Sequence, residues 1–331
     1  MYRAIVALIL AAFTIWSALW FISQRIVRDS LMALSAQLQD SGLTVNYSDL
    51  RIRGYPYRLD ATLDELVIAD PKNGTEWRAP YFQLLMLIYS TNHIIAVWPE
   101  EQEFEISGRT HSVRSKGLRA SLKTDGRNSE IERFVVETER LSVDGLPLSV
   151  ESVLIALRQK GENGNSYEFS LSTEIPEPAP PPEGSHAIPV PAGDGRLVLR
   201  ADLEFNRPLS GSTCAGGAGR LLALRVPEAT LAWPSIALQG ESDISFDESG
   251  LASGPITLSA SDPSQLADLL GQNSLALDSF GSIALRIAAL AVNGNEAQLT
   301  LTNGKIGIRG FLGGLLDDLK IGKFPPLRIC S

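Results

Sequence analysis

The segment Tyr57-Arg58-Leu59-Asp60-Ala61-Thr62-Leu63-Asp64 decides the fold class of this chain. Tyr, Leu, Ala and Leu alternate there with Arg, Asp, Thr and Asp, and a period of two places these two sets on opposite faces of a β-strand. Residues 70–74, Asp-Pro-Lys-Asn-Gly, then supply a turn. We therefore expect a mainly β protein with a long, curved antiparallel sheet. The alternation recurs between turn residues at 118–123, 167–172, 197–205 and 297–301.

An apolar segment precedes this β region. Its 19 residues, 4–22, hold no charge and as a helix span roughly 28 Å, close to the ~30 Å hydrocarbon thickness of a bilayer. Trp16, Trp20 and Phe21 lie at its far end, where aromatic rings favour the membrane interface and a cleavable signal peptide has small residues instead. We expect residues 1–24 to form an uncleaved transmembrane anchor. The flanking charges are balanced and do not set its orientation.

The anchor continues as an amphipathic helix. Val27, Leu31, Leu34 and Leu38 follow one another at helical spacing, and the pattern ends near Gly42. Their stripe can cap the β body, lie on the bilayer or pair with a second copy of the chain. We expect the first.

Residues 174–195 contain seven prolines and predict an extended linker or loop. This segment separates residues 25–173, the amphipathic helix with a first antiparallel half, from residues 196–331, a second β half with two helices. Their similar pattern leaves a duplication open. The second half is expected to hold a helix capped by Asp262, another helix over 280–291 and a hairpin at Asn303-Gly304. The helices are expected to cover the sheet.

One strand is apolar on both faces and forms the candidate apolar groove. A turn is expected after it, at Thr91-Asn92-His93, before the apolar run 94–98. A strand apolar on both faces needs cover on both faces, which either a packed helix or a bound acyl chain would provide. The groove residues are Phe82, Leu84, Met86 and Ile88 on one face and Leu85 and Leu87 on the other.

Tyr55, Tyr57 and Arg58 flank a break in the strand pattern made by Gly54 and Pro56. Two interpretations are open. The tyrosines line the mouth of a groove while Arg58 holds an anionic head group, or the break is a sheet corner where the tyrosines pack and Arg58 pairs with a neighbouring carboxylate.

No motif for catalysis, metal or cofactor binding stands out. His93, His111 and His186 lack metal-ligand spacing, so we expect a non-enzymatic protein without a cofactor or metal. Cys214 and Cys330 either form a disulfide in an oxidising compartment or are two unrelated thiols. The chain has 38 acidic against 29 basic residues, which argues against nucleic acid as a partner.

Several motifs together carry a family resemblance. They are the N-terminal anchor with its amphipathic helix, the Gly-Tyr-Pro-Tyr-Arg-Leu-Asp break at 54–60, the Trp-Arg-Ala-Pro segment at 77–80 and the closing hairpin at 299–308. The chain resembles an uncharacterised family of single-anchor bacterial envelope proteins, distantly similar to AsmA-like and TamB-like inner-membrane proteins. The resemblance implies a single-pass inner-membrane protein with most of its chain facing the periplasm.

These observations lead to two hypotheses of function. In the first, the protein binds or guides phospholipid or another envelope lipid along an apolar face of the curved sheet. In the second, it is a structural or assembly protein that contacts other envelope proteins.

Overall fold

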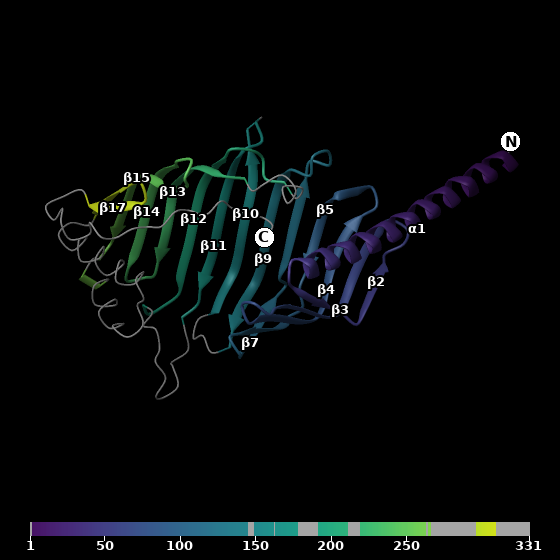
Figure 1. Ribbon diagram of the computed structural model, residues 1–331, viewed down its shortest axis with the longest axis horizontal. Coiled ribbons are helices and arrows are strands. Elements are labelled where there is room, and N and C mark those ends of the chain that lie inside the picture. The colour runs from purple at the N-terminus through teal and green to yellow at the C-terminus, as the bar shows by residue number, and fades with distance from the viewer. Residues whose placement is uncertain are drawn as a thin grey trace. The chain divides into compact units, whose positions relative to one another are not determined.

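The computed structural model describes residues 2–144, 149–161, 163–177, 191–210, 219–262, 264–265 and 296–308. Within these ranges the chain forms one helix, α1 (Tyr2–Asp40), and strands β1 to β17, whose pairings are antiparallel (Figure 1). This confirms the expected mainly β class with a long N-terminal helix. The chain divides into two compact units, unit 1 (Met1–Gly126 and Glu137–Gly145) and unit 2 (Arg127–Val136 and Leu146–Ser331).

Unit 1 is built around β3, which pairs with β1 and β2 on one side and with β4 on the other. Beyond β4 the sheet branches, because residues 83–87 of β4 pair with β5 and residues 75–78 pair with β6. The strands of unit 1 are β1 (Thr44–Asn46), β2 (Asp49–Arg53), β3 (Arg58–Asp70), β4 (Thr75–Leu87), β5 (Ser90–Val97), β6 (Glu101–Ile106), β7 (Arg109–Lys116), β8 (Arg119–Thr124) and the second part of β9 (Ile131–Val143).

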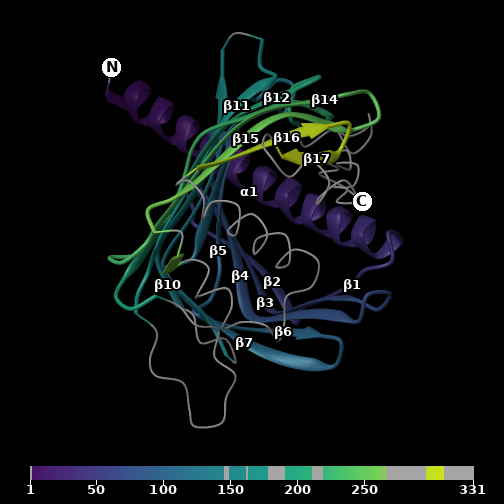
Figure 2. The ribbon, with the colours of Figure 1, turned by 90° about the vertical axis from the view of Figure 1, so that its left-hand side faces the viewer.

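Helix α1 lies across one face of β1, β2 and β3 (Figure 2). Leu59 and Ala61, the apolar positions of the alternating segment, are 0% exposed beneath it. Val27 and Leu31 pack on this cluster, which confirms that the helix caps the β body. Leu34 is 51% exposed, so the contacting stripe differs from the expected one.

Helix α1 ends as the sequence indicates. Gly42 has φ +98°, and its N–H donates to the carbonyl of Gln39 at 2.9 Å, while Leu43 donates to Leu38 at 3.1 Å. A glycine in this left-handed conformation closes a helix because it satisfies carbonyls that lack a partner within the helix.

The turn expected at residues 70–74 joins β3 to β4. Asp70 Oδ1 accepts hydrogen bonds from the backbone N–H groups of Lys72 and Asn73, at 3.0 and 3.3 Å. The side chain of Asn73 donates to Asp70 Oδ2 at 2.7 Å. This last bond above all lowers the pKa of Asp70.

The prediction of a turn at Thr91-Asn92-His93 is wrong, because these residues lie inside β5. The chain reverses at Ile88 and Tyr89 instead, and Leu87 pairs directly with Ser90. The polar side chains are satisfied by the neighbouring strand: Asn92 Nδ2 donates to the carbonyl of Thr124 at 2.8 Å, and the ring of His93 lies 2.9 Å from the hydroxyl of Ser121. Turn-forming residues can therefore occupy a strand when a neighbour accepts their hydrogen bonds.

Unit 2 is a meander in which consecutive strands from β10 to β17 pair antiparallel. Its core includes Tyr167 and Phe205, 0% and 1% exposed, whose rings meet edge to face at 5.8 Å. The strands are β10 (Ser149–Lys160), β11 (Ser166–Ile175), β12 (Gly195–Phe205), β13 (Leu221–Ala232), β14 (Ala237–Phe246), β15 (Ala252–Ala260), β16 (Glu296–Thr302) and β17 (Lys305–Ile308), with the first part of β9.

Several local predictions for unit 2 are confirmed. Asn303 and Gly304 join β16 to β17 with φ values of 50° and 74°, as the favoured two-residue hairpin turn requires. Asp262 Oδ1 accepts the N–H groups of Ser264 and Gln265, at 3.1 and 3.0 Å, in a helix-capping arrangement.

Other predictions for unit 2 fall partly or wholly outside the described residues. The helix expected to begin at Pro263 is described only at Ser264 and Gln265, which are helical. The helix expected over 280–291 lies outside the described residues, as does most of the proline-rich segment. The described ends of that segment show that β11 runs to Ile175 and β12 begins at Gly195.

Candidate functional site

The N-terminal part of α1 is a candidate single membrane anchor. Among the described residues, α1 is the one helix long and apolar enough to cross a bilayer. Its large side chains stay exposed, with Leu8 at 71% and Phe13 at 60%, because this part of the helix projects beyond the strands of unit 1 (Figure 1). An apolar helix left uncovered by its own protein is typical of one that is solvated by lipid.

Three side chains at the end of the apolar segment attach α1 to the turn between β2 and β3. Trp16 Nε1 donates to the carbonyl of Pro56, and Trp20 Nε1 donates to the carbonyl of Arg58, both at 2.8 Å. The hydroxyl of Ser17 lies 2.8 Å from that of Tyr55. The Gly-Tyr-Pro-Tyr-Arg break therefore holds the helix where it leaves the expected bilayer.

Tyr55 packs its ring against the same part of the helix. Its centroid lies 5.5 Å from that of Trp20, edge to face, and 6.3 Å from that of Phe21. Trp20 is only 5% exposed and belongs to the buried cluster with Leu59 and Ala61.

Tyr55, Tyr57 and Tyr89 form an exposed edge that we call the tyrosine rim. They are 44%, 53% and 69% exposed. The N–H of Ile88 donates to the carbonyl of Tyr57 at 3.0 Å, so the β4–β5 turn adjoins the β2–β3 turn. Tyrosines beside a membrane helix are typical of the bilayer interface, where the ring lies in the apolar zone and the hydroxyl in the polar one.

Arg58 pairs with a carboxylate of its own strand. Its Nη2 lies 2.8 Å from Asp60 Oδ2, and the arginine side chain is 48% exposed. A head group at Arg58 would share the guanidinium with Asp60.

The structure separates the predicted groove residues into three groups. Leu84, Met86 and Ile88 are half-buried and pack on the cluster beneath α1. This part of the face is therefore covered by a helix. Phe82 lies on the same face further from the tyrosine rim. Leu85 and Leu87 lie on the opposite face.

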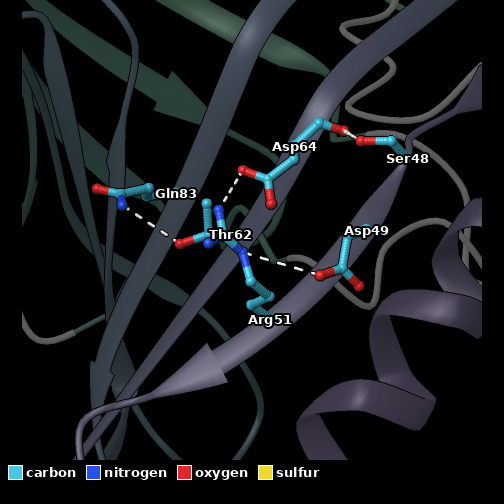
Figure 3. Close-up of polar contacts among 6 residues, drawn as sticks. All are labelled: Ser48, Asp49, Arg51, Thr62, Asp64 and Gln83. Atoms are coloured by element: carbon cyan, nitrogen blue, oxygen red, sulfur yellow. Dashed lines mark hydrogen bonds and ion pairs between the residues drawn. The ribbon is translucent and has the colours of Figure 1, made fainter.

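The opposite face of the β2–β3–β4 sheet carries many polar contacts (Figure 3). Arg51 bridges the carboxylates of Asp49 and Asp64, and Gln83 Nε2 donates to Thr62 Oγ1 at 3.2 Å. The hydrogen bond to Asp64 is the main cause that raises the pKa of Arg51. Around these residues the face is polar, whereas Leu85 and Leu87 form a half-buried apolar part of the same face.

Phe82 belongs to a group of four rings that we call the aromatic patch: Trp77, Phe82, Trp98 and Phe104. Phe82 meets Trp98 at 5.2 Å and Trp77 at 5.9 Å, and Trp77 stacks on Phe104 at 6.2 Å. All four rings are half-buried. The sequence does not predict this patch, because its rings are brought together by the branching of the sheet at β4.

A buried polar group orients the patch. Gln102 is 3% exposed, and its Oε1 accepts the indole N–H of Trp77 at 3.1 Å. The hydroxyl of Ser115, itself 4% exposed, donates to the carbonyl of Pro99 at 3.3 Å. The bond to Gln102 fixes the indole of Trp77, whose ring stacks on Phe104.

Between the tyrosine rim and the aromatic patch, the apolar face continues onto β5 and β8. Ile94 pairs with Met86 and with Leu122, and Ala96 pairs with Leu84. Paired residues share a face, so Ile94, Ala96 and Leu122 form an apolar strip beside the residues that α1 covers. All three are half-buried.

The histidines and cysteines were the candidates for metal or redox chemistry. In the described parts of the chain, no group of three His, Cys, Asp or Glu side chains is arranged to hold a metal ion. His93 lies in β5, His111 lies in β7, and His186, Cys214 and Cys330 lie outside the described residues.

The chain was compared with protein families, curated proteins and solved structures. No curated protein and no solved structure matches the chain. A family model matches residues 20–308, from the end of the apolar segment to the closing hairpin. The chain therefore belongs to the family described as "Uncharacterized protein conserved in bacteria (DUF2125)".

Proposed function

We propose that this protein is a non-enzymatic component of the bacterial envelope that binds lipid acyl chains on the apolar face of unit 1. In this proposal α1 anchors the protein in the inner membrane by a single pass, and the body faces the periplasm. The export-like N-terminus and the β-rich composition of the body support this orientation.

One observation carries the proposal: an apolar face begins at the anchor and continues to exposed parts of aromatic rings. Leu87, at the end of β4, lies beside the tyrosine rim, and Phe82 lies five residues away along the same strand. At about 3.4 Å per residue, the distance between them is roughly 17 Å. One leaflet of a bilayer has a hydrocarbon thickness of about 15 Å. A lipid with its head group at the rim would therefore reach the aromatic patch with the end of one acyl chain.

The apolar strip offers the route between these two points. Helix α1 covers Leu84 and Met86, but the strip beside them passes over a small residue, Ala96, on its way to Trp98. A bound acyl chain would remove the apolar side chains of the strip from contact with water. The free energy gained is proportional to the apolar area that is removed from water.

A blocking substitution tests the proposal. The full chain in phosphatidylcholine nanodiscs is titrated with a fluorescent fatty acid, and the Ala96→Trp variant is compared with the wild type. We expect the bulky ring to fill the strip and weaken binding about tenfold or more. The matched control is Gln83→Trp on the polar face of the neighbouring strand, which should stay within about twofold of wild type.

Absence of fatty-acid binding by the wild-type chain would contradict the proposal, as would equal losses in Ala96→Trp and Gln83→Trp. Circular dichroism checks that both variants are folded. If Ala96→Trp is unfolded, Ala96→Leu replaces it, because leucine fills the same strip with a smaller change in volume. Fatty-acid binding by Ala96→Leu then tests the proposal.

A further inference from the structure

A second feature lies in unit 2, apart from the anchor and from the proposed lipid face. It is a pocket of about 520 Å³ on the sheet formed by β10, β11 and β12, with Arg133 from the first part of β9 at its side. Its size is within the usual range of small-molecule sites, about 300–1,000 Å³.

The register of the strands explains why these side chains gather. Ala156 pairs with Ser170, which pairs with Arg200, and Leu154 pairs with Ser172. Directly paired residues share a face, so this row lies on one side of the sheet. The core residue Tyr167 falls on the opposite face because it lies three positions, an odd number, from Ser170 in the same strand.

Arginines predominate in the lining of the pocket, although the chain is acidic overall and Glu174 is the register partner of Arg196 on the neighbouring strand. Four arginines against one glutamate line it, although the whole chain has a net charge of −9. The lining arginines are Arg133, Arg158, Arg196 and Arg200.

Two of these arginines already have a carboxylate partner. Arg158 lies 2.5 Å from Glu168, and Arg200 lies 3.3 Å from Glu228. For Arg133 and Arg196 the described part of the chain provides no ion pair or side-chain hydrogen bond. Within that part of the chain, these two guanidinium groups therefore line the pocket with their donors available.

The rest of the lining suits a ligand with both polar and apolar parts. Leu154, Ala156 and Val198 supply small and medium apolar surface, and the hydroxyls of Ser170 and Ser172 supply further hydrogen-bonding groups. Guanidinium groups bind phosphate and carboxylate oxygens in a bidentate manner, and phosphate carries the higher charge.

We propose that this pocket binds a small phosphate-bearing anion, with Arg133 and Arg196 as its principal ligands. The phosphate group can belong to a soluble phosphate ester or to the head group of a lipid. Either source presents the same chemistry to the arginines. The site lies in unit 2 and does not depend on lipid binding by unit 1.

The test uses the full chain in phosphatidylcholine nanodiscs and two soluble probes, inorganic pyrophosphate and glycerol 1-phosphate, measured by calorimetry. We expect the double variant Arg133→Gln and Arg196→Gln to bind at least one probe about tenfold or more weakly than the wild type. The control double variant, Arg53→Gln and Arg109→Gln in unit 1, has the same change in net charge and should stay within about twofold.

A second arm distinguishes the lipid source. Vesicles containing phosphatidylglycerol are mixed with the nanodisc-bound chain and separated by flotation. Capture that depends on Arg133 and Arg196, without binding of the soluble probes, assigns the site to a lipid head group. The proposal is overturned if neither arm shows binding, or if the unit 1 control loses as much binding as the pocket variant.

Discussion

Trp20 is the residue on which the attachment of the anchor to the body depends most. Its ring is buried in the cluster with Leu59 and Ala61, and its indole N–H donates to the carbonyl of Arg58. It therefore contributes packing and a hydrogen bond at the same place. Trp16, four residues earlier, makes the corresponding bond to Pro56 but stays 39% exposed.

We expect Trp20→Ala to lower the free energy of unfolding of unit 1 by about 3–5 kcal/mol, because it leaves a cavity and an unpaired carbonyl. Urea unfolding of the full chain in detergent micelles measures this change. Leu34→Ala, in the same helix but at an exposed position, should change the unfolding free energy by less than about 1 kcal/mol. Equal effects of the two substitutions would show that α1 is not packed on the sheet as described.

Asp70 gives the β3–β4 turn a dependence on pH. The hydrogen bond from Asn73 is the main cause that lowers the pKa of Asp70 in the folded chain. Its contribution to stability is therefore present above the unfolded pKa of about 3.9 and is lost as the pH falls through the lower folded value.

Asp70→Asn removes the charge and keeps an amide oxygen that can accept the two backbone hydrogen bonds, but its NH2 group cannot accept the bond from Asn73. We expect the variant to unfold at a lower temperature than the wild type at pH 7, and we expect a smaller difference at a pH of about 2, which is below the unfolded pKa. Thermal unfolding followed by circular dichroism at both pH values measures the difference. A gap that stays constant with pH would mean that the ionised carboxylate does not stabilise the turn.

At the scale of elements, the sequence predicts the strands better than it predicts what surrounds them. Alternation places β3, β8, β11 and β12, because each has one face toward a core and one toward polar surroundings. The Asn-Gly turn and the glycine at the end of α1 also follow from local backbone chemistry. The prediction of a turn before Ile94 fails, because the side chain of Asn92 donates a hydrogen bond to Thr124, in a strand that is distant in sequence.

The apolar groove shows why a site is harder to predict than its strands. Periodicity correctly places Leu84 and Met86 on one face, but it does not say which element covers them. The aromatic patch depends on β4 pairing with both β5 and β6, and Phe104 has no local signal that marks it. Register between distant strands is not encoded in any short segment.

The β2–β3 turn is the element that connects the tyrosine rim to the anchor, and Gly54 limits its shape. Gly54 has φ +104°, and a Cβ atom there would lie 2.7 Å from Cβ of Arg58 and 2.9 Å from its carbonyl oxygen. Both the backbone conformation and the contact with backbone exclude a side chain.

We expect Gly54→Ala to displace this turn and loosen α1 from it, which limited proteolysis of the nanodisc-bound chain detects as faster cleavage near residues 54–58. Gly108→Ala is the matched control, since Gly108 also has a positive φ, +78°, but a Cβ atom there would meet nothing within 4 Å. Gly108→Ala should lower the free energy of unfolding by about 1 kcal/mol through backbone strain, without exposing the anchor. Unchanged cleavage in Gly54→Ala would argue against the role of this turn.

At the scale of the whole molecule, the proposal links the anchor with the apolar face of unit 1. The apolar part of α1 is long and apolar enough to span a bilayer, and residues that follow it pack on the sheet. In this proposal the tyrosine rim lies beside the membrane interface, and the apolar strip begins at the height of the lipid head groups. The same chain carries the arginine-lined pocket in unit 2, for which we propose an independent role in binding a phosphate group.

Site-specific photocrosslinking in living bacteria tests the central claim most directly. The photoreactive amino acid p-benzoylphenylalanine replaces Trp98 in the aromatic patch or, as a control, Gln83 on the polar face, and mass spectrometry identifies the adducts. Lipid binding by the apolar face predicts a phospholipid adduct at position 98 and none at position 83. A protein adduct at position 98, or no adduct there in a folded and membrane-bound chain, would contradict it.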